Sequence, residues 1–271
     1  THVFHVASPF LMPEQITDGE TQVVEPARAG TRNVLDAVDR TPSVQRVVLT
    51  STVGAIFGDY VDVLEMTDQT LSETYVNHTS TVDNNPYHYA KTLAETMAWE
   101  RAAAQDRWDL VAISPGLILG PTLSGASDSG SLFLMDELMG GAFFFGAADF
   151  SFTFVDVREV AAAHIAAAEL PSAHGRYILA RPEMVSLLDM GRIIRRRHPW
   201  RLLVPAHPVP DALVRRIGPR FGLDPDYIAK HLGIRFAVDN RRSVEELGIH
   251  YRPVAETVLD HDAARRRRQR R

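Results

Sequence analysis

The sequence predicts an α/β protein built around a parallel sheet. Short runs rich in β-branched and apolar residues, such as 44–52 and 109–114, alternate with longer segments that have helical apolar spacing. The strand-like runs are almost continuously apolar, which is typical of parallel strands covered by helices on both faces. A chain of 271 residues with 45% hydrophobic residues is long enough for one large domain or two closely packed ones.

The first half of the chain supplies most of the expected sheet. Strands are expected at 2–7, 44–52 and 109–114, and helices at 21–40 and 86–105. Pro26 lies near the first turns of the earlier helix and Pro86 opens the later one, where the missing N–H of proline is tolerated. A polar stretch from about Gly58 to Asn85 separates the second strand from the second helix.

The second half of the chain differs from the first in amino-acid composition. Loops rich in Gly, Ser and Phe are expected from residue 117 through 150. Residues 152–170 predict a strand that leads directly into a helix, with Asp156 and Glu159 at capping-box spacing. A further strand is expected at 175–180 and a helix at 186–197, followed by short strands and helices to about residue 262.

Composition excludes several functional classes. The chain has no cysteine, so disulfides, thiolate catalysis and zinc–sulfur sites are absent. No apolar run is long enough to span a membrane and no charged, apolar leader precedes the first strand, so a cytoplasmic protein is expected. The formal net charge is −5 even with the Arg-rich segment 265–271, and aromatic and basic residues are not interleaved as in nucleic-acid binders. We therefore expect neither a membrane nor a nucleic acid as partner.

Tyr87 and Lys91 are the strongest catalytic candidates. They lie four residues apart on an expected helix, so both side chains leave the same face. A nearby ammonium favours the phenolate and should lower the pKa of the Tyr87 side chain, which could then act as a general acid or base. The chain has 29 basic residues, and only two are lysine. A compact ammonium at position 91 therefore points to a specific role.

Two strand ends supply further candidates. Thr52 ends the expected strand 44–52, and ligands of open parallel sheets bind at the carboxyl ends of strands. A hydroxyl there can hold a carbonyl oxygen, although Ser51 and Thr52 could equally cap the strand. Pro115 and Gly116 break the strand at 109–114 and could bring the backbone close to a ligand.

Together these segments resemble the extended branch of the short-chain dehydrogenase/reductase superfamily, and within it the dihydroflavonol-reductase and cinnamoyl-CoA-reductase-like group. The matching segments follow the family's order to about residue 262: VFHVASP, PARAGTRNVLDA, RVVLTSTVGAIFG, PYHYAKTLAETMAWE, LVAISPGLILGP, FVDVREVAAAHIAAAE, GRYILA and DNRRSVEELGIHYRPVAETV. The resemblance implies a Rossmann-like, doubly wound parallel sheet with a smaller C-terminal substrate lobe. It divides the chain into a partial dinucleotide-binding domain (1–116), a mixed region with the substrate lobe (117–262, returning to the sheet at about 151–180) and a basic, disordered tail (263–271).

The resemblance also implies an NAD(P)-dependent oxidoreductase. Tyr87 would exchange the proton, Lys91 would bind the nicotinamide ribose, and Thr52 would stand where most members carry Ser, with Ser51 as the alternative. The implied reaction is hydride transfer between a nicotinamide and an aldehyde, a ketone or the matching alcohol, with NADP favoured over NAD. The resemblance is also compatible with a homodimer, in which the partner would be a second copy of the chain. The implied cofactor-binding residues are Val6, Ala7, Ser8, Ser51, Tyr87, Lys91, Pro115, Leu117 and Ile118.

One family feature is missing from this sequence. Members open with a strand, a Gly-x-x-Gly-x-x-Gly turn and a helix that together hold the cofactor pyrophosphate, and no such glycine pattern occurs here. In the family, VFHVASP is the fourth strand. We therefore expect an N-terminally incomplete fold that lacks the first three strands, has an unpaired apolar edge at 2–7, and binds cofactor poorly.

Three alternative functions stay open. A catalytically silent module that senses a dinucleotide or binds a partner would fit the missing phosphate cradle, but the retained Tyr87, Lys91 and Thr52 argue against it. A sugar-nucleotide epimerase or dehydratase, or a hydroxysteroid dehydrogenase, would share the three residues and differ in the substrate lobe. The phenylalanines at 143–154 suggest an apolar carbonyl substrate, or simply core and strand positions. Gly-x-Ser-x-Gly and HExxH are absent, and His5 and His164 are interpreted as ordinary strand and helix residues.

Overall fold

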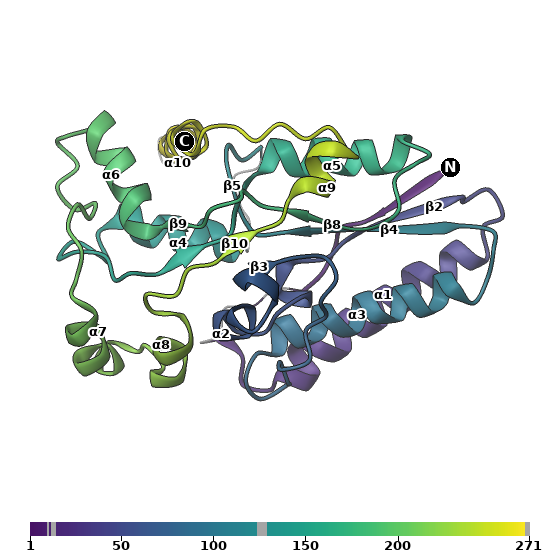
Figure 1. Cartoon of the computed structure of the whole chain (residues 1–271), viewed down its shortest axis with the longest axis horizontal. Helices are drawn as coiled ribbons and strands as arrows, with labels where there is room; N and C mark the ends of the chain where they lie inside the picture. The colour runs from purple at the N-terminus through teal and green to yellow at the C-terminus, as the bar shows by residue number, and fades with distance from the viewer. Residues whose placement is uncertain (10, 12–14, 124–128, 269–271) are drawn as a thin grey trace.

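A four-stranded parallel sheet forms the centre of the protein (Figure 1). The computed structural model describes residues 1–9, 11, 15–123 and 129–268. The sheet has the order β1-β2-β4-β8, with β1 at His2–His5, β2 at Arg46–Thr50, β4 at Asp109–Pro115 and β8 at Gly175–Leu179. All three neighbouring pairs run parallel. The predicted α/β fold with a parallel sheet is therefore confirmed.

Helices cover both faces of this sheet, which explains why β2 and β4 are buried along almost their whole length. Figure 1 shows α1 (Glu25–Asp39) and α3 (Pro86–Ala103) on one face and α5 (Val157–Glu169) on the other. Alternate residues of β2 serve the two sides: Val47 packs with Leu35 of α1, and Val48 packs with Ala163 of α5. A π-helical turn at Glu20–Val24 leads into α1, and the predicted capping box of Asp156 and Glu159 opens α5.

The polar stretch after β2 folds into short elements that lie beside the carboxyl ends of the strands. They are the 3₁₀ turn η3 (Val53–Ala55), α2 (Tyr60–Leu64), the 3₁₀ turn η4 (Thr67–Gln69) and β3 (Thr70–Leu71). β3 pairs in parallel with β10 (Ala237–Val238), which comes from the far end of the chain. Ile56, Phe57 and Leu71 form a separate buried cluster here with Ile178 of β8.

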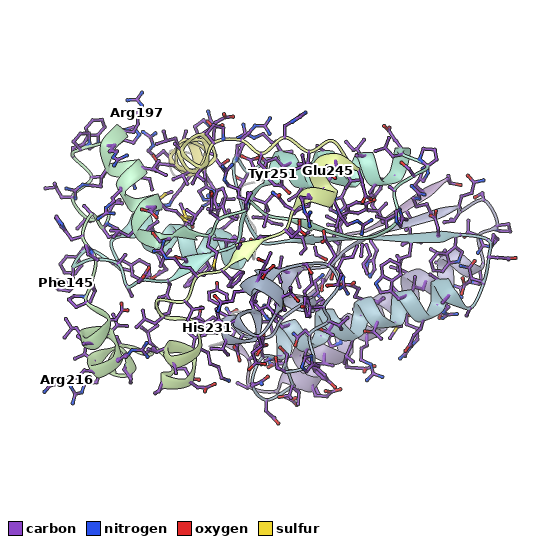
Figure 2. All side chains as sticks on the ribbon, in the orientation of Figure 1. Phe145, Arg197, Arg216, His231, Glu245 and Tyr251 are labelled. Atoms are coloured by element: carbon purple, nitrogen blue, oxygen red, sulfur yellow. The ribbon has the colours of Figure 1, made fainter. Side chains whose placement is uncertain are left out.

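The remaining elements build a C-terminal lobe. They are β5 (Leu117–Leu119), α4 (Gly130–Gly140), β6 (Ser151–Phe152), β7 (Phe154–Asp156), β9 (Val185–Ser186), α6 (Leu187–Arg197), α7 (Asp211–Ile217), the 3₁₀ turn η5 (Gly218–Phe221), α8 (Pro225–His231) and α10 (Val254–Arg268). Helix α9 (Arg241–Glu245) instead packs against β8 of the central sheet. β5 pairs with β7 and β6 with β9 in two small sheets. Phe150 and Phe154 belong to the lobe's core, whereas Phe145 is 82% exposed at the outer end of the lobe (Figure 2).

Two sequence-based predictions for this half are wrong. Residues 130–140 form helix α4 rather than a loop, because their interior is Leu, Phe and Met and the glycines stand at the helix ends, where Gly141 adopts a φ of 101°. Residues 263–268 of the expected disordered tail belong to α10, since Arg268 pairs with Asp136 at 3.1 Å and Arg266 with Asp262 one helical turn earlier. Residues 269–271 lie outside the described residues.

β1 stands at the edge of the sheet, with β2 as its only strand partner among the described residues. Phe4 is 47% exposed and Val6 is 58% exposed, so this edge is apolar, as expected. Three expectations stay predictions. They are that the fold lacks the family's first three strands, that a domain boundary lies at residue 116, and that the protein is cytoplasmic. Each helix within the described part of the chain is too short or too polar to cross a bilayer.

Candidate active site

Helix α3 presents Tyr87 and Lys91 one turn apart, as the sequence predicts. The helix starts sharply because the Asn85 side chain accepts a hydrogen bond from the His88 N–H at 3.1 Å and Pro86 occupies the first helical position. Lys91 is 7% exposed and Tyr87 is partly buried. Both side chains therefore sit between the helix and the rest of the protein, where their chemistry is set by burial.

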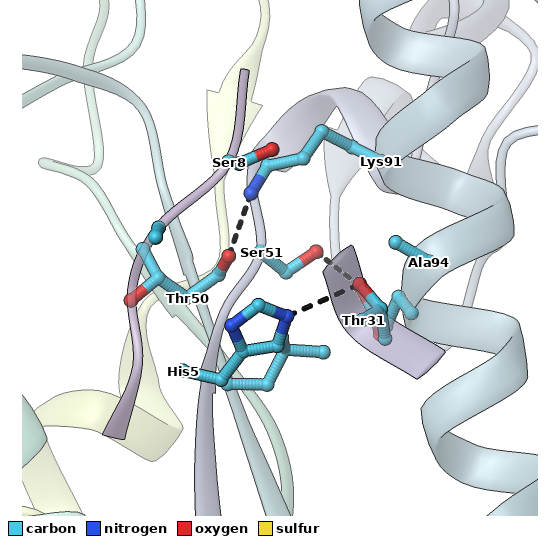
Figure 3. Close-up of a pocket in the computed structure, with 10 residues that line it drawn as sticks. His5, Ser8, Thr31, Thr50, Ser51, Lys91 and Ala94 are labelled. Carbon is cyan, nitrogen blue, oxygen red and sulfur yellow. Dashed lines mark hydrogen bonds between the residues drawn. The ribbon is translucent and has the colours of Figure 1, made fainter. Parts of the chain in front are cut away.

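The Lys91 ammonium is fixed at the carboxyl end of β2. Its Nζ donates to the Thr50 carbonyl oxygen at 2.8 Å (Figure 3). Because β2 ends at Thr50, Ser51 is the first residue beyond the strand, and its hydroxyl donates to the Glu95 carboxylate one turn after Lys91. These two bonds tie α3 to the strand end at which ligands of parallel sheets bind.

A small polar cavity lies beside Lys91. Its volume is about 10 Å³, which is room for about one water molecule. Four of the predicted cofactor-binding residues line it: Ala7, Ser8, Ser51 and Lys91. His5 also lines it and bonds through Nε2 to the Thr31 hydroxyl of α1 at 3.1 Å, which ties β1 to α1 (Figure 3).

Thr52 and Tyr87 lie next to this cavity along the chain but do not line it. The Thr52 Oγ1 accepts from the Gly54 N–H at 3.2 Å and caps η3. A Cβ at Gly54 would lie 2.3 Å from the His88 ring, so only glycine lets η3 approach the first turn of α3 this closely. Thr52 therefore caps the turn that follows the strand rather than the strand itself, and its catalytic role stays a prediction.

Four predicted cofactor-binding residues lie apart from the cavity. Val6 is exposed beyond β1, and Pro115 is the buried last residue of β4. Leu117 packs against the lobe's core and Ile118 against the sheet's core. At Gly116 the backbone approaches the protein itself, since a Cβ there would lie 2.6 Å from the Thr153 carbonyl oxygen; the predicted approach to a ligand stays a prediction.

Burial shifts both candidate groups away from their charged forms. It lowers the pKa of Lys91 to about 8, against an opposing effect of the Glu95 charge. It raises the pKa of Tyr87 to about 12. The expectation that Tyr87 would have a pKa below that of an ordinary phenol is therefore wrong, because desolvation of the phenolate outweighs any stabilisation by the nearby ammonium.

Sequence reasoning missed several residues of this region. Glu95 is 2% exposed and also accepts from Arg176 of β8, 81 positions along the chain, at 2.6 Å. His5 bonds Thr31 across 26 positions. Only Glu95 had a local signal, because it follows Lys91 by four residues on the same helix.

Comparison with known proteins places this geometry in context. The family model described as "NAD dependent epimerase/dehydratase family" matches residues 1–180. Cinnamoyl-CoA reductase CAD2 of Medicago truncatula is 34% identical over 199 residues, which cover 73% of this chain and 58% of the relative. Cinnamoyl-CoA reductase 2 of Arabidopsis thaliana is 38% identical over 193 residues, which cover 69% of this chain and 54% of the relative. The chain thus spans about half the length of the curated relatives it matches.

Solved structures agree with the fold. The crystal structure of Gre2 from Candida albicans in complex with NADPH matches with a TM-score of 0.73 and 26% identity. The match covers 97% of this chain and 76% of that one, so it extends over both the sheet and the lobe.

Proposed function

The chain belongs to the NAD dependent epimerase/dehydratase family, in the extended short-chain dehydrogenase/reductase superfamily, and we propose that it carries the catalytic residues of an NAD(P)-dependent carbonyl reductase. The observation that supports this most is the pair of Tyr87 and Lys91 on one face of α3, with the Lys91 ammonium held at the end of β2. The reaction is reduction of an aldehyde or ketone, or oxidation of the matching alcohol.

The strand ends fit a nicotinamide cofactor. One of the three N–H donors of Lys91 reaches Thr50, and no other acceptor within the described residues takes the remaining two. Lys91 can therefore donate to ribose hydroxyls, with Ser8 and Ser51 beside it. NADPH is favoured, since the Gre2 structure from Candida albicans contains it. The bound nicotinamide supplies or accepts the hydride.

The protein's own residues handle the proton and the carbonyl oxygen. Tyr87 is a phenol at neutral pH, since its pKa is raised to about 12, so in the direction of reduction it already carries the proton that the carbonyl oxygen needs. The Lys91 ammonium stabilises the phenolate that remains after that transfer. In this proposal the Thr52 hydroxyl, just after the end of β2, holds the carbonyl oxygen, with Ser51 as the alternative.

The test is turnover of the wild type and two variants of α3. Oxidation of NADPH and NADH is measured against a panel of aryl and alkyl aldehydes and ketones. Tyr87→Phe should lower turnover by about 100-fold or more, because general acid catalysis typically contributes that much. Dinucleotide binding, followed by fluorescence titration, should change little.

Tyr89→Phe is the matched control, because it removes a hydroxyl two positions away on the same helix and should leave turnover unchanged. Normal turnover by Tyr87→Phe would show that the proposed mechanism is wrong. Light scattering on the same samples tests the homodimer that the family resemblance leaves open.

A further inference from the structure

Glu95 is a buried carboxylate that the proposed reaction does not use. It is 2% exposed and lies on α3 four residues after Lys91, which itself lies four after Tyr87. Side chains at this spacing share one face of a helix. Tyr87, Lys91 and Glu95 therefore form one row that faces the sheet.

Three donors from different places converge on the Glu95 carboxylate. The Ser51 hydroxyl at the end of β2 donates to Oε2. The Trp99 Nε1 donates to Oε1 at 3.0 Å, and the Arg176 Nε of β8 donates to the same oxygen at 2.6 Å. Glu95 thus ties α3 to two strands of the sheet.

Arg176 is what makes this buried charge tolerable. A carboxylate removed from water needs a partner charge and hydrogen bonds, and Arg176 is itself only 12% exposed at its side chain. The guanidinium also donates to the carbonyl oxygens of Glu73 at 3.2 Å and Tyr75 at 2.7 Å. The pair is therefore fixed by the backbone around it and cannot rotate away.

Glu95 is the negative group that acts on the Lys91 ammonium. Its charge raises the pKa of Lys91 and so opposes burial, which lowers it. The other titratable groups facing Lys91 are histidines and the Tyr87 phenol. His5 of β1 lines the same cavity, and its pKa is lowered by burial and by the charge of Lys91. The His164 ring of α5 forms a hydrogen bond with the Thr50 hydroxyl at 2.7 Å, and burial lowers its pKa as well. Both histidines are thereby kept neutral near neutral pH and cannot replace the carboxylate.

Resting on the proposed function, we propose that Glu95 is a positioning residue of the active site: its carboxylate fixes Ser51, next to Thr52, and keeps the Lys91 ammonium charged. Arg176 tunes this effect, because it neutralises part of the negative field that reaches Lys91. We therefore expect Glu95 and Arg176 to have opposite effects on the pKa of Lys91.

The two-lysine composition makes a direct test practical. Lysine labelled with ¹³C at Cε gives one resonance each for Lys91 and Lys230, and Lys230→Arg assigns them. The titration midpoint of Lys91 should lie at about pH 8 in the wild type. It should fall by about one pH unit in Glu95→Gln, because a nearby opposite charge is lost. It should rise in Arg176→Gln, because the hydrogen bonds from Ser51 and Trp99 still stabilise the Glu95 carboxylate, whose charge then acts on Lys91 without compensation.

Two controls separate charge from packing. Glu95→Asp keeps the charge and should hold the midpoint near that of the wild type. Glu100→Gln removes the same charge from the exposed face of the same helix and should leave it unchanged. If Glu95 had a purely structural role, Glu95→Gln and Arg176→Gln would not shift the titration midpoint of Lys91 in opposite directions.

Unchanged midpoints in both Glu95→Gln and Arg176→Gln would overturn the inference. Circular dichroism checks that each variant is folded; if Glu95→Gln does not fold, the direction of the shift in Arg176→Gln decides. The titration needs no cofactor, so it stands apart from turnover. Failure of the wild type to reduce any carbonyl under conditions in which it binds NADPH would refute the proposed function and leave the Lys91 midpoint to decide the role of Glu95.

Discussion

The carboxyl end of the parallel sheet and the junction between α2 and α8 each hold one of the chain's two lysines. Lys91 is 7% exposed, bonds one backbone carbonyl, and has its pKa lowered to about 8 by burial. Lys230 is partly exposed and lies between two carboxylates, 3.1 Å from Asp59 and 2.6 Å from Asp226, which raise its pKa.

The comparison of Lys91 with Lys230 shows that the same residue type can have different chemical properties in different environments. Lys230 joins two elements by ion pairs that the chain elsewhere makes with arginine. Lys91 sits where its neutral and charged forms are close in free energy, which is the property that burial gives to reactive groups. The environment of a rare residue is therefore more informative than its rarity.

The largest expected difference between the two lysines is in turnover. Lys91→Met should lower kcat/KM by about 100-fold or more, because the phenolate of Tyr87 loses its nearby cation. Lys230→Met should stay within about twofold of the wild type, since it removes only partly exposed ion pairs to Asp59 and Asp226 that do not contact the cavity beside Lys91. Steady-state kinetics of both variants check this, and an equal loss in both would erase the distinction.

The second largest difference is expected in the free energy of unfolding, when the carboxylates Glu95 and Asp226 are removed in turn. Glu95→Ala leaves Arg176 buried without a counter-charge and should lower the free energy of unfolding by about 3–5 kcal/mol. Asp226→Ala should cost less than about 1 kcal/mol, because its side chain is 64% exposed. Urea unfolding measures both, and similar losses would contradict the contrast in burial.

The pH dependence should have opposite signs at the two lysines. Between about 8 and 10.5 the unfolded chain binds more protons at position 91 than the folded one, so the contribution of Lys91 to stability rises with pH. The raised pKa of Lys230 gives a contribution that is present below 10.5 and lost above it. Turnover should fall above about pH 8 as the Lys91 ammonium deprotonates. Unfolding curves of Lys91→Met and Lys230→Met across pH, with a pH–rate profile, check each sign.

The smallest effect concerns salt. The ion pair of Lys230 with Asp226, whose side chain is 64% exposed, should weaken as ionic strength rises, whereas the buried Glu95–Arg176 pair should respond little. The stability difference between Lys230→Met and the wild type should therefore shrink from low salt to about 1 M salt. A difference that stays constant would mean that Lys230 acts through packing.

Local sequence signals predicted the elements of this site well. Pro86 and the apolar spacing predicted α3, and the Tyr87–Lys91 spacing predicted their shared face. The β-branched runs predicted β2 and β4, although β2 ends at Thr50, two residues before the expected end, because Thr52 turns to cap η3.

Long-range contacts could not be predicted in this way. The bond from Arg176 to Glu95 joins residues from β8 and α3, and no local pattern encodes it. The pKa of Tyr87 depends on how much water the folded chain excludes, which spacing does not reveal. In α10, the Asp262–Arg266 spacing was visible in the sequence, but the pairing of Arg268 with Asp136 required the lobe to be folded.

The contact between Gly54 and His88 has a consequence for mutational tolerance. One added methyl group at position 54 would collide with a ring that belongs to the same helical turn as Tyr87. Accommodation must displace the His88 ring or shift the start of α3, and in the second case the Tyr87 phenol would move with it. In a saturation library at this position, variants other than glycine should lose activity before they lose fold. The single hydrogen atom that glycine carries there therefore limits the position of the phenol that we propose as the general acid.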